Sequence, residues 1–369
     1  MRGRKYFPEE QPALEADLDG YLEWLGTQVR VSPGFRALLL GGGYGRGEGG
    51  IWLPVDGSAH RLYNDLEFYL FSGPVKGHHL RSWMEEGEKR LHIDIEIKVI
   101  PPAAFQRARP SMFYYDLLKA HVLVAGDAGW VRSLPEELSR AENIPPVEAS
   151  RLLVNRGMSL LRCLRWSQGE LELNEGFCDR IVAKLKLALG DAVLCSLGKY
   201  HWSCRERNHG LAEVVDFPPS WPQLVAWHAE GVSFKFNPRH LQQAPKDWEA
   251  TLTEISGAWV ETFLWIESRR LKTTFLTPLD YARFGGRLFP EESAAANILR
   301  QARDLARGRR APWTGTDHPR SVVWKSLCLL LDPNRTEESV LTAAKLLESP
   351  DSEPAGIEER CRSAWQNYP

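Results

Sequence analysis

The stretch LLLGGGYGRGEGG, residues 38–50, decides how the rest of the chain is interpreted. An apolar run ends at Leu40, and seven of the next ten residues are glycines, with Arg46 and Glu48 among them. A structural turn needs only one or two glycines, which adopt the left-handed backbone region without strain. So many glycines indicate that a ligand lies against bare peptide N–H groups, and a phosphate group suits such a backbone.

The bulk composition is that of an ordinary globular protein with room for two domains. The 369 residues are 43% hydrophobic and 25% charged,. The formal net charge is -2, so no overall positive field recruits long nucleic acid,. The six cysteines form no CxxC pair, which favours buried free thiols in a reducing compartment over a zinc site or a disulfide framework,.

Neither a targeting segment nor a membrane span is evident in the sequence. Residues 1–20 carry positive charge but no apolar core, so they do not resemble a signal peptide,. No run approaches the roughly 18 consecutive apolar residues that a bilayer-spanning helix needs. We therefore expect a cytoplasmic protein with no membrane partner.

Periodicity predicts one helix and three strands around the glycine stretch. Leucines at helical spacing predict a helix over residues 9–30,. The apolar run 35–40 and the aromatic-rich run DLEFYLF, residues 65–71, are typical of strands,. The run LHIDIEIKVI, residues 91–100, alternates apolar and polar residues throughout, which predicts a strand with one buried face,.

The character of the chain changes after the third strand. From about Ser111 it reads as helices joined by short breakers, although residues 209–245 and 272–290 fit no clear element,. The predicted fold class is α+β. An N-terminal α/β domain with a small mixed sheet, residues 1–110, precedes a larger all-helical domain, residues 111–369,.

Carboxylates gather in two of the predicted strands. Asp65 and Glu67 project from one face of their strand, about 7 Å apart at Cα,. If the strand that carries Asp94 and Glu96 is a neighbour, three carboxylates converge. Clustered carboxylates repel one another and need cations, and hard oxygen ligands select Mg²⁺ or Mn²⁺. With a glycine backbone nearby to hold phosphates, the set predicts a two-metal phosphoryl or nucleotidyl transfer site.

In this order the residues resemble the nucleotidyltransferase superfamily of the DNA polymerase β type. That family carries a GG or GS motif, then a D-x-D/E pair on a strand, then a third acid on a later strand. The matching residues here are Gly42-Gly43 with Arg46-Gly47, then Asp65 and Glu67, then Asp94. The segment IDIEIKVIP resembles the family's third strand, with an aspartate between two isoleucines, which favours Asp94 over Glu96.

The segment FYYDLLKAHVLVAGD, residues 113–127, extends the resemblance. It is similar to the helix after the catalytic domain in small bacterial nucleotidyltransferases, including aminoglycoside adenylyltransferases and antitoxin-type enzymes. The resemblance covers residues 35–130, and the helical remainder fits such enzymes in kind only.

The resemblance implies a mechanism. Asp65 and Glu67 would bind the metal that grips the triphosphate, and Asp94 would complete the second metal site and act as base. ATP or another nucleoside triphosphate would donate a nucleotidyl group, with AMP as the first expectation, to the hydroxyl of a small molecule, a protein or an RNA end. By the same resemblance the nucleotide would be held by Gly42, Gly43, Tyr44, Arg46 and Gly47. Lys184 lies in a helical segment that is either an ordinary amphipathic core helix with solvated lysines or a wall that closes over the nucleotide and places a lysine on the triphosphate,.

Two departures and two alternatives accompany this interpretation. The second acid is Glu67, where aspartate is commoner, and the gap before Asp65 is long, which suggests an inserted loop over residues 51–62.

One alternative is a non-catalytic nucleotide-binding protein of a regulatory or toxin–antitoxin type. Another is a helical scaffold with a degenerate catalytic domain. Residues 45–50 also match GxGxxG, but no clear helix or βαβ pattern follows, which disfavours a dinucleotide fold,.

Overall fold

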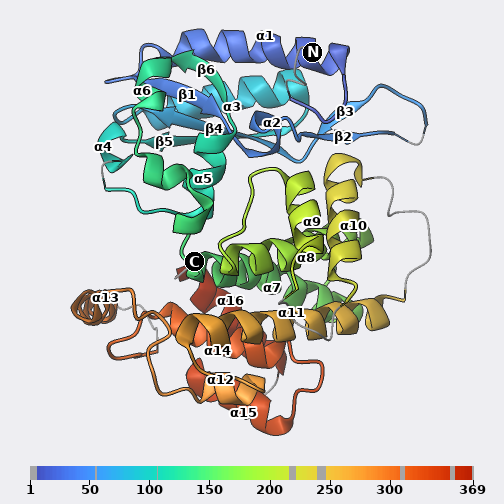
Figure 1. Cartoon of the computed structure of the whole chain (residues 1–369), viewed down its shortest axis with the longest axis vertical. Coiled ribbons are helices and arrows are strands. Elements are labelled where there is room, and N and C mark those ends of the chain that lie inside the picture. Colours follow the sequence, from blue (N-terminus) through green and yellow to red (C-terminus); the bar gives the residue numbers. More distant parts are fainter. Residues whose placement is uncertain are drawn as a thin grey trace. The chain divides into compact units, whose positions relative to one another are not determined.

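A computed structural model gives the fold of the chain (Figure 1). It describes residues 6–54, 56–105, 107–215, 222–238, 247–307, 312–349 and 354–367. The chain divides into two compact units. The first comprises Met1–Glu148, Leu197–Glu213 and Ala229–Ala244, and the second comprises Ala149–Ser196, Val214–His228 and Pro245–Pro369. A small mixed sheet with many helices confirms the α+β class.

The first unit contains a four-stranded sheet in the order β5-β4-β1-β6. Its strands are β1 (Ala37–Leu40), β4 (Asp65–Phe71), β5 (Asp94–Ile100) and β6 (Val122–Gly126). Strands β4 and β5 are parallel, whereas β1 is antiparallel to both β4 and β6, so the sheet is mixed as predicted.

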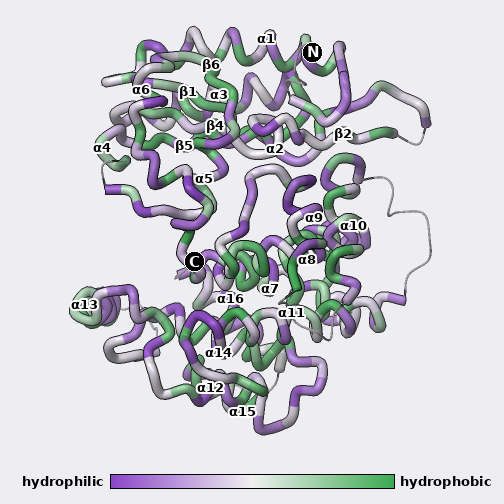
Figure 2. Tube along the Cα trace, in the orientation of Figure 1, coloured by the Kyte–Doolittle hydropathy of each residue, from purple (hydrophilic) through white to green (hydrophobic). Residues whose placement is uncertain are grey.

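Helices cover both faces of the sheet (Figure 1). One face carries α1 (Pro12–Val29) and α3 (Gly77–Leu91). The other carries α4 (Pro102–Phe105), α5 (Met112–Lys119) and α6 (Ala128–Arg132), followed by the short 3₁₀ helices η1 (Glu136–Ser139) and η2 (Ala141–Asn143). The tube in Figure 2 shows β1 as hydrophobic, as expected of a strand that is buried along its whole length.

Strand alternation decides which side chains enter the core. Leu66, Phe68 and Leu70 of β4 pack with α1 and α3 in a cluster that also includes Ile95 and Ile97 of β5. Because successive side chains point to opposite faces, the polar residues between them lie on the face that carries α5. The period-two pattern of β4 and β5 therefore directs their carboxylates away from the main core.

The inserted loop predicted over residues 51–62 is partly a hairpin. Strands β2 (Gly50–Trp52) and β3 (Arg61–Tyr63) pair antiparallel, and the rings of Trp52 and Tyr63 stack at 6.1 Å. Tyr44 fastens this hairpin, because its hydroxyl lies 2.8 Å from the carbonyl of Gly50 and accepts the N–H of Tyr63 at 2.8 Å.

The first unit does not end at residue 110, where the sequence placed a domain boundary. Strand β6 lies in a stretch interpreted as helical, and it pairs with β1 as an edge strand of the same sheet. The unit also takes in α9 (Cys204–Ala212) and part of α10 (Leu224–Phe236). A run of five residues is too short for periodicity to separate a strand from a helix,.

The second unit is helical in the residues that the structure describes. It contains most of α7 (Val147–Ser167), α8 (Glu175–Ser196), α11 (Trp248–Leu271), α12 (Pro278–Ala282), α13 (Ala294–Ala306), α14 (Arg320–Leu330), α15 (Glu337–Leu346) and α16 (Pro354–Asn367). In its core the rings of Trp259 and Phe263 stack at 4.8 Å, and the Trp259 indole N–H donates to the carbonyl of Leu153 at 2.7 Å.

Two predictions about the whole chain can be compared with these units. The six cysteines are buried free thiols, as expected from their spacing. In the described residues no helix combines the length and the apolar character that crossing a membrane requires.

Candidate metal centre

The turn after β1 lies beside the first residues of β4 and β5. Because β1 runs antiparallel to β4, its carboxyl end meets the amino end of β4, and the Gly41 N–H donates to the carbonyl of Glu67 at 2.9 Å. In the parallel register, Asp65 is opposite Asp94 and Glu67 is opposite Glu96. One edge of the sheet therefore brings the glycine turn and the acidic residues together.

Three carboxylates converge there. Asp65, Glu67 and Glu96 each offer one oxygen, and these oxygens all lie within 4.8 Å of one another. Asp65 and Glu67 are half-buried and Glu96 is exposed. Neither Glu67 nor Glu96 forms an ion pair with a lysine or arginine in the described part of the chain. This donor set of three oxygens fits a hard divalent cation such as Mg²⁺ or Mn²⁺.

Electrostatics at Glu67 reflect this crowding. Burial is the largest cause that raises the pKa of Glu67, and the charge of Asp65 raises it further. Glu96 acts in the same direction, while the positive charge of Arg46 opposes them. Like charges in a partly dehydrated site disfavour ionisation, and a bound cation would reverse that preference.

The structure groups Glu96, rather than Asp94, with the carboxylate pair of β4. Asp94 pairs in register with Asp65 and is exposed, but it is not one of the three residues whose ligand oxygens converge. The sequence argument preferred Asp94 because it lies between two isoleucines. Glu96 also lies between two isoleucines, Ile95 and Ile97, so that signal could not distinguish the two acids.

Gly42 is a glycine because of this centre. Its φ is +59°, and a Cβ atom at this position would lie 2.3 Å from Oε2 of Glu67. At Gly45 a Cβ atom would lie 2.2 Å from the carbonyl oxygen of Leu40. Several glycines of the stretch therefore make room for the protein's own atoms, which corrects the interpretation that their number alone signals a ligand.

The remaining backbone donors of the turn lie at the start of α2 (Gly42–Gly45). The N–H groups of Gly45 and Arg46 donate to the carbonyls of Gly41 and Gly43. Those of Gly42, Gly43 and Tyr44 have no backbone acceptor among the described residues. They are the groups of the turn that could still bind a phosphate oxygen.

Arg46 has a carboxylate partner of its own. One guanidinium nitrogen lies 3.0 Å from Oδ2 of Asp116 on α5, and Nε lies 3.8 Å from Glu48. Burial is the largest single influence on the pKa of Arg46 and lowers it, but Asp116, Tyr200 and Glu48 together outweigh burial, so the pKa of Arg46 is raised. The resemblance assigned Arg46 to the triphosphate, whereas the geometry commits its charge to holding α5 against the glycine turn.

Glu48 anchors the far end of the turn, a role that the sequence did not reveal. Its Oε1 accepts hydrogen bonds from the Ser203 hydroxyl and the Cys204 N–H, at 2.8 and 2.9 Å. Its Oε2 lies 2.9 Å from Nζ of Lys235 on α10. Burial opposes ionisation of Glu48, but Lys235, Arg46 and Ser203 outweigh it and lower the pKa to about 2. The feature of the sequence that could have indicated this role is the presence of an acid inside a glycine-rich stretch.

The other residues expected to hold the nucleotide lie in various surroundings. Tyr44 is buried and its hydroxyl is used in the hairpin, while Gly47 has φ +71° and donates its N–H to the carbonyl of Tyr44. Lys184 lies on α8 in the second unit and is half-buried.

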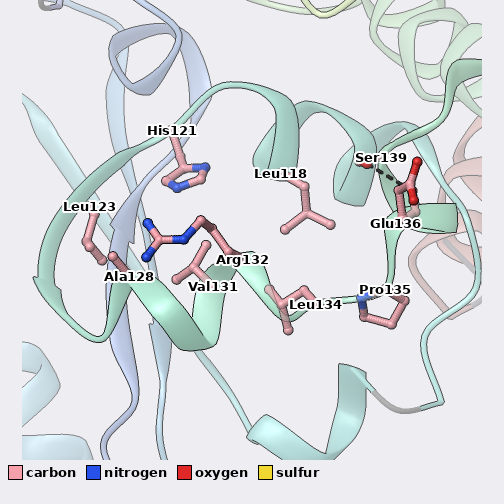
Figure 3. Close-up of a pocket in the computed structure, with 10 residues that line it drawn as sticks. All are labelled: Leu118, His121, Leu123, Ala128, Val131, Arg132, Leu134, Pro135, Glu136 and Ser139. Carbon is pink, nitrogen blue, oxygen red and sulfur yellow. Dashed lines mark hydrogen bonds between the residues drawn. The ribbon is translucent and has the colours of Figure 1, made fainter.

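A cavity of about 420 Å³ lies elsewhere in the first unit (Figure 3). Figure 3 shows the guanidinium of Arg132 beside the imidazole of His121, with Glu136 and Ser139 at one end of the wall and mostly apolar side chains between. His121 Nδ1 lies 2.8 Å from the carbonyl of Leu117, and burial lowers its pKa. None of the three converging carboxylates lines this cavity, so it is separate from the metal centre.

No protein-family model matches the chain, and a search of curated proteins finds no match. The argument for function therefore rests on the motif residues and on the geometry in which the fold places them.

Proposed function

We propose that the chain is a metal-dependent nucleotidyltransferase that transfers a nucleoside monophosphate, AMP in the first instance, from a nucleoside triphosphate to a hydroxyl. The observation that carries the proposal is the convergence of Asp65, Glu67 and Glu96 within 4.8 Å, at the amino ends of two parallel strands and beside a glycine turn. Like charges at this separation favour a divalent cation, and the neighbouring N–H groups favour a phosphate oxygen.

The three carboxylates would hold Mg²⁺ or Mn²⁺, which supplies charge neutralisation at the triphosphate and lowers the pKa of the attacking hydroxyl. Asp65 and Glu67 come from one strand and Glu96 from the next, so the rigid sheet fixes their spacing. Gly42 allows the turn to approach the Glu67 carboxylate, which a Cβ atom at this position would displace. Arg46 and Glu48 act by holding that turn in place.

Titration of ATP into the protein, with and without Mg²⁺, tests the proposal. We expect Mg²⁺-dependent binding of ATP that Asp65→Ala reduces by about tenfold or more, because the variant loses a metal ligand. Asp56→Ala is the matched control, since Asp56 is an exposed acid in the hairpin loop. Equal binding by wild type, Asp65→Ala and Asp56→Ala would contradict the proposal, as would no binding of any of the four nucleoside triphosphates.

One observation favours a second function, nucleotide binding without transfer. The charge of Arg46 is committed to Asp116 and Glu48, so this arginine would not neutralise a triphosphate in the transition state,. Pyrophosphate release distinguishes the two functions: a transferase releases pyrophosphate when a hydroxyl acceptor is supplied, whereas a binding protein retains intact ATP.

A further inference from the structure

The cavity in Figure 3 lies on the face of the sheet that carries α5 and α6. Its described walls come from the end of α5, from β6, from α6 and from the segment that leads into η1. All of these elements belong to the first unit. The volume of about 420 Å³ is at the lower end of the range of roughly 300–1,000 Å³ that is usual for small-molecule sites,. The cavity therefore fits a small organic molecule.

Most of the wall is apolar and continues the packing of that face. Leu118, Leu123 and Leu134 are half-buried and pack against the hydrophobic cluster that contains Val131, which also lines the cavity. Pro135 extends the apolar wall toward η1. An apolar group placed against these side chains removes apolar surface from water, which is favourable. The cavity therefore selects a ligand with an apolar body.

Arg132 supplies a positive charge to this wall. It is the last residue of α6, and its guanidinium lies among the lining side chains beside the imidazole of His121 (Figure 3). In the part of the chain that the structure describes, the Arg132 side chain makes neither an ion pair nor a hydrogen bond. The side chain is exposed, so a ligand can reach it from solvent. A guanidinium in this position can bind a carboxylate through paired hydrogen bonds.

Two other polar residues of the lining, Glu136 and Ser139, are engaged within the protein. Nη2 of Arg140 lies 2.8 Å from Oε1 of Glu136, and this hydrogen-bonded ion pair lowers the pKa of Glu136. The charge of Lys119 lowers it further. The Ser139 hydroxyl donates to the backbone carbonyl of Glu136 at 2.9 Å, as the dashed line in Figure 3 shows. Glu136 is thus paired with Arg140, and the charge of Arg132 is left for an anion.

His121 contributes a hydrogen-bond acceptor rather than a second charge. Its Nδ1 lies 2.8 Å from the carbonyl oxygen of Leu117, and because a carbonyl can only accept, Nδ1 carries the proton,. Burial lowers the pKa of His121 below its ordinary value of 6.5, although the hydrogen bond to Leu117 acts in the opposite direction. The ring is therefore neutral near pH 7, and Nε2 holds a lone pair. Nε2 has no partner among the described residues, so a hydroxyl of a ligand can donate to it.

We propose that this cavity binds a small 2-hydroxy acid with an apolar body. The carboxylate pairs with Arg132, the adjacent hydroxyl donates to Nε2 of His121, and the apolar body lies against the leucines and Val131. A single guanidinium matches the single charge of a carboxylate, and the neighbouring imidazole suits a second polar group on the next carbon,. The lining contains none of the converging carboxylates of the metal centre, so this inference does not depend on the proposed transferase activity.

Calorimetric titration of the full chain near pH 7, without added metal or nucleotide, tests this inference. The probes are 3-phenyllactate, 3-phenylpropanoate, which lacks only the hydroxyl, and 3-phenyllactamide, which lacks the negative charge. We expect 3-phenyllactate to bind and 3-phenylpropanoate to bind about fivefold more weakly, because it loses one hydrogen bond. The amide should bind more weakly than 3-phenyllactate by about tenfold or more, because it loses the pairing with the guanidinium.

Variants assign the two interactions to their residues. Arg132→Gln should weaken the binding of 3-phenyllactate by about tenfold. Arg81→Gln is the matched control, because Arg81 is an exposed arginine of α3, on the opposite face of the sheet and outside the lining, and it should bind as wild type does. His121→Phe keeps an aromatic ring but loses the acceptor, so it should bind 3-phenyllactate and 3-phenylpropanoate equally. Circular dichroism verifies that each variant is folded.

The inference is overturned if wild type does not bind 3-phenyllactate, if the amide binds as tightly as the acid, or if Arg132→Gln and Arg81→Gln bind the acid equally. Equal binding of 3-phenyllactate and 3-phenylpropanoate by wild type would contradict the contact between the hydroxyl and His121. A folded His121→Phe variant that still prefers 3-phenyllactate would contradict it as well. Because no metal or nucleotide is present, a failure of the transferase proposal leaves these outcomes unchanged.

Discussion

Each of the two units contains a group of like charges, but the fold brings the members of the two groups together in different ways. In the first unit, Asp65, Glu67 and Glu96 come from two neighbouring strands, and sheet register alone brings them together. In the second unit, Arg151, Arg300 and Arg320 come from three helices far apart in sequence. Both groups keep like charges close together, an arrangement that costs stability unless opposite charge compensates it.

A third charged group shows the opposite case. Glu48 is buried, but Lys235, Ser203 and Cys204 compensate its charge within the protein. Its pKa is lowered, whereas that of Glu67 is raised. The difference separates a carboxylate that stabilises the fold from one that is available for a ligand, and the following predictions test that distinction.

Lys235→Met has the largest expected effect on stability. It leaves Glu48 buried with only the more distant Arg46 as a counter-charge, and we expect a loss of about 3 kcal/mol in the free energy of unfolding. Chemical denaturation at pH 7 measures it. In the double variant Lys235→Met/Glu48→Gln much of the loss should be recovered, and no recovery would show that Lys235 stabilises by packing alone.

The pH dependence of stability provides a check on the same pair. The pKa of Glu48 is about 2 in the folded protein, which is below its ordinary value. The contribution of Glu48 to stability is therefore fully present at any pH above that ordinary pKa. It is lost as pH falls toward 2. The stability difference between wild type and Glu48→Gln should therefore shrink progressively below about pH 4.5. A difference that is constant from pH 7 to pH 3 would contradict the assignment.

Gly42→Ala is expected to have the next largest effect on the free energy of unfolding. The new Cβ would meet the Glu67 carboxylate at 2.3 Å in a residue whose φ is +59°, so we expect a loss of about 2 kcal/mol,. Gly57→Ala is the control, because Gly57 also has positive φ but no atom within 4 Å of its Cβ position. Equal losses in the two variants would mean that backbone strain, and not contact with Glu67, causes the effect.

Glu67→Gln should change stability in the opposite direction. Without metal, it removes repulsion among the three carboxylates, and we expect a gain of about 1 kcal/mol. In excess Mn²⁺ the order should reverse, because wild type alone gains the full binding energy of the cation. Thermal unfolding in chelator and in Mn²⁺ measures both, and a variant that is less stable than wild type in chelator would contradict the like-charge account.

Arg300→Gln is expected to have the smallest effect. The substitution reduces repulsion between Arg300 and Arg320, but the Arg300 side chain is partly exposed, so the gain in the free energy of unfolding should be about 0.5 kcal/mol or less,. Chemical denaturation of both proteins measures this gain, and a variant that is less stable than wild type would contradict the repulsion between these arginines.

A feature of the fold or the site could be predicted from the sequence where it depends on residues close together in the chain. Alternation within β4 and β5 predicted the strands and the shared face of Asp65 and Glu67. Which of Asp94 and Glu96 joins the carboxylate group depends on the pairing register of β4 with β5 and on the length of the side chain. The isoleucines that flank both acids carry no information on either. The helix α5 lies where the resemblance expected one, but β6 was missed because a five-residue strand carries little periodicity.

Long-range pairs could not be predicted from the sequence at all. The partner of Arg46 is 70 residues away, and that of Glu48 is 187 residues away. No spacing rule relates such residues, so Arg46 was assigned to a phosphate while its charge is used within the fold. The group of Arg151, Arg300 and Arg320 was missed for the same reason, since only the packing of α7, α13 and α14 brings these arginines near Glu292.

The most direct test of the central claim is Mn²⁺ titration, followed by electron paramagnetic resonance, of wild type, Glu96→Gln and Asp94→Asn. These variants neutralise two acids of one strand, of which only Glu96 has an oxygen within 4.8 Å of those of Asp65 and Glu67. The account predicts that Glu96→Gln weakens Mn²⁺ binding by about tenfold or more, and that Asp94→Asn changes it by less than about threefold. Loss of binding in Asp94→Asn with wild-type binding in Glu96→Gln, or no Mn²⁺ binding by wild type, would contradict it.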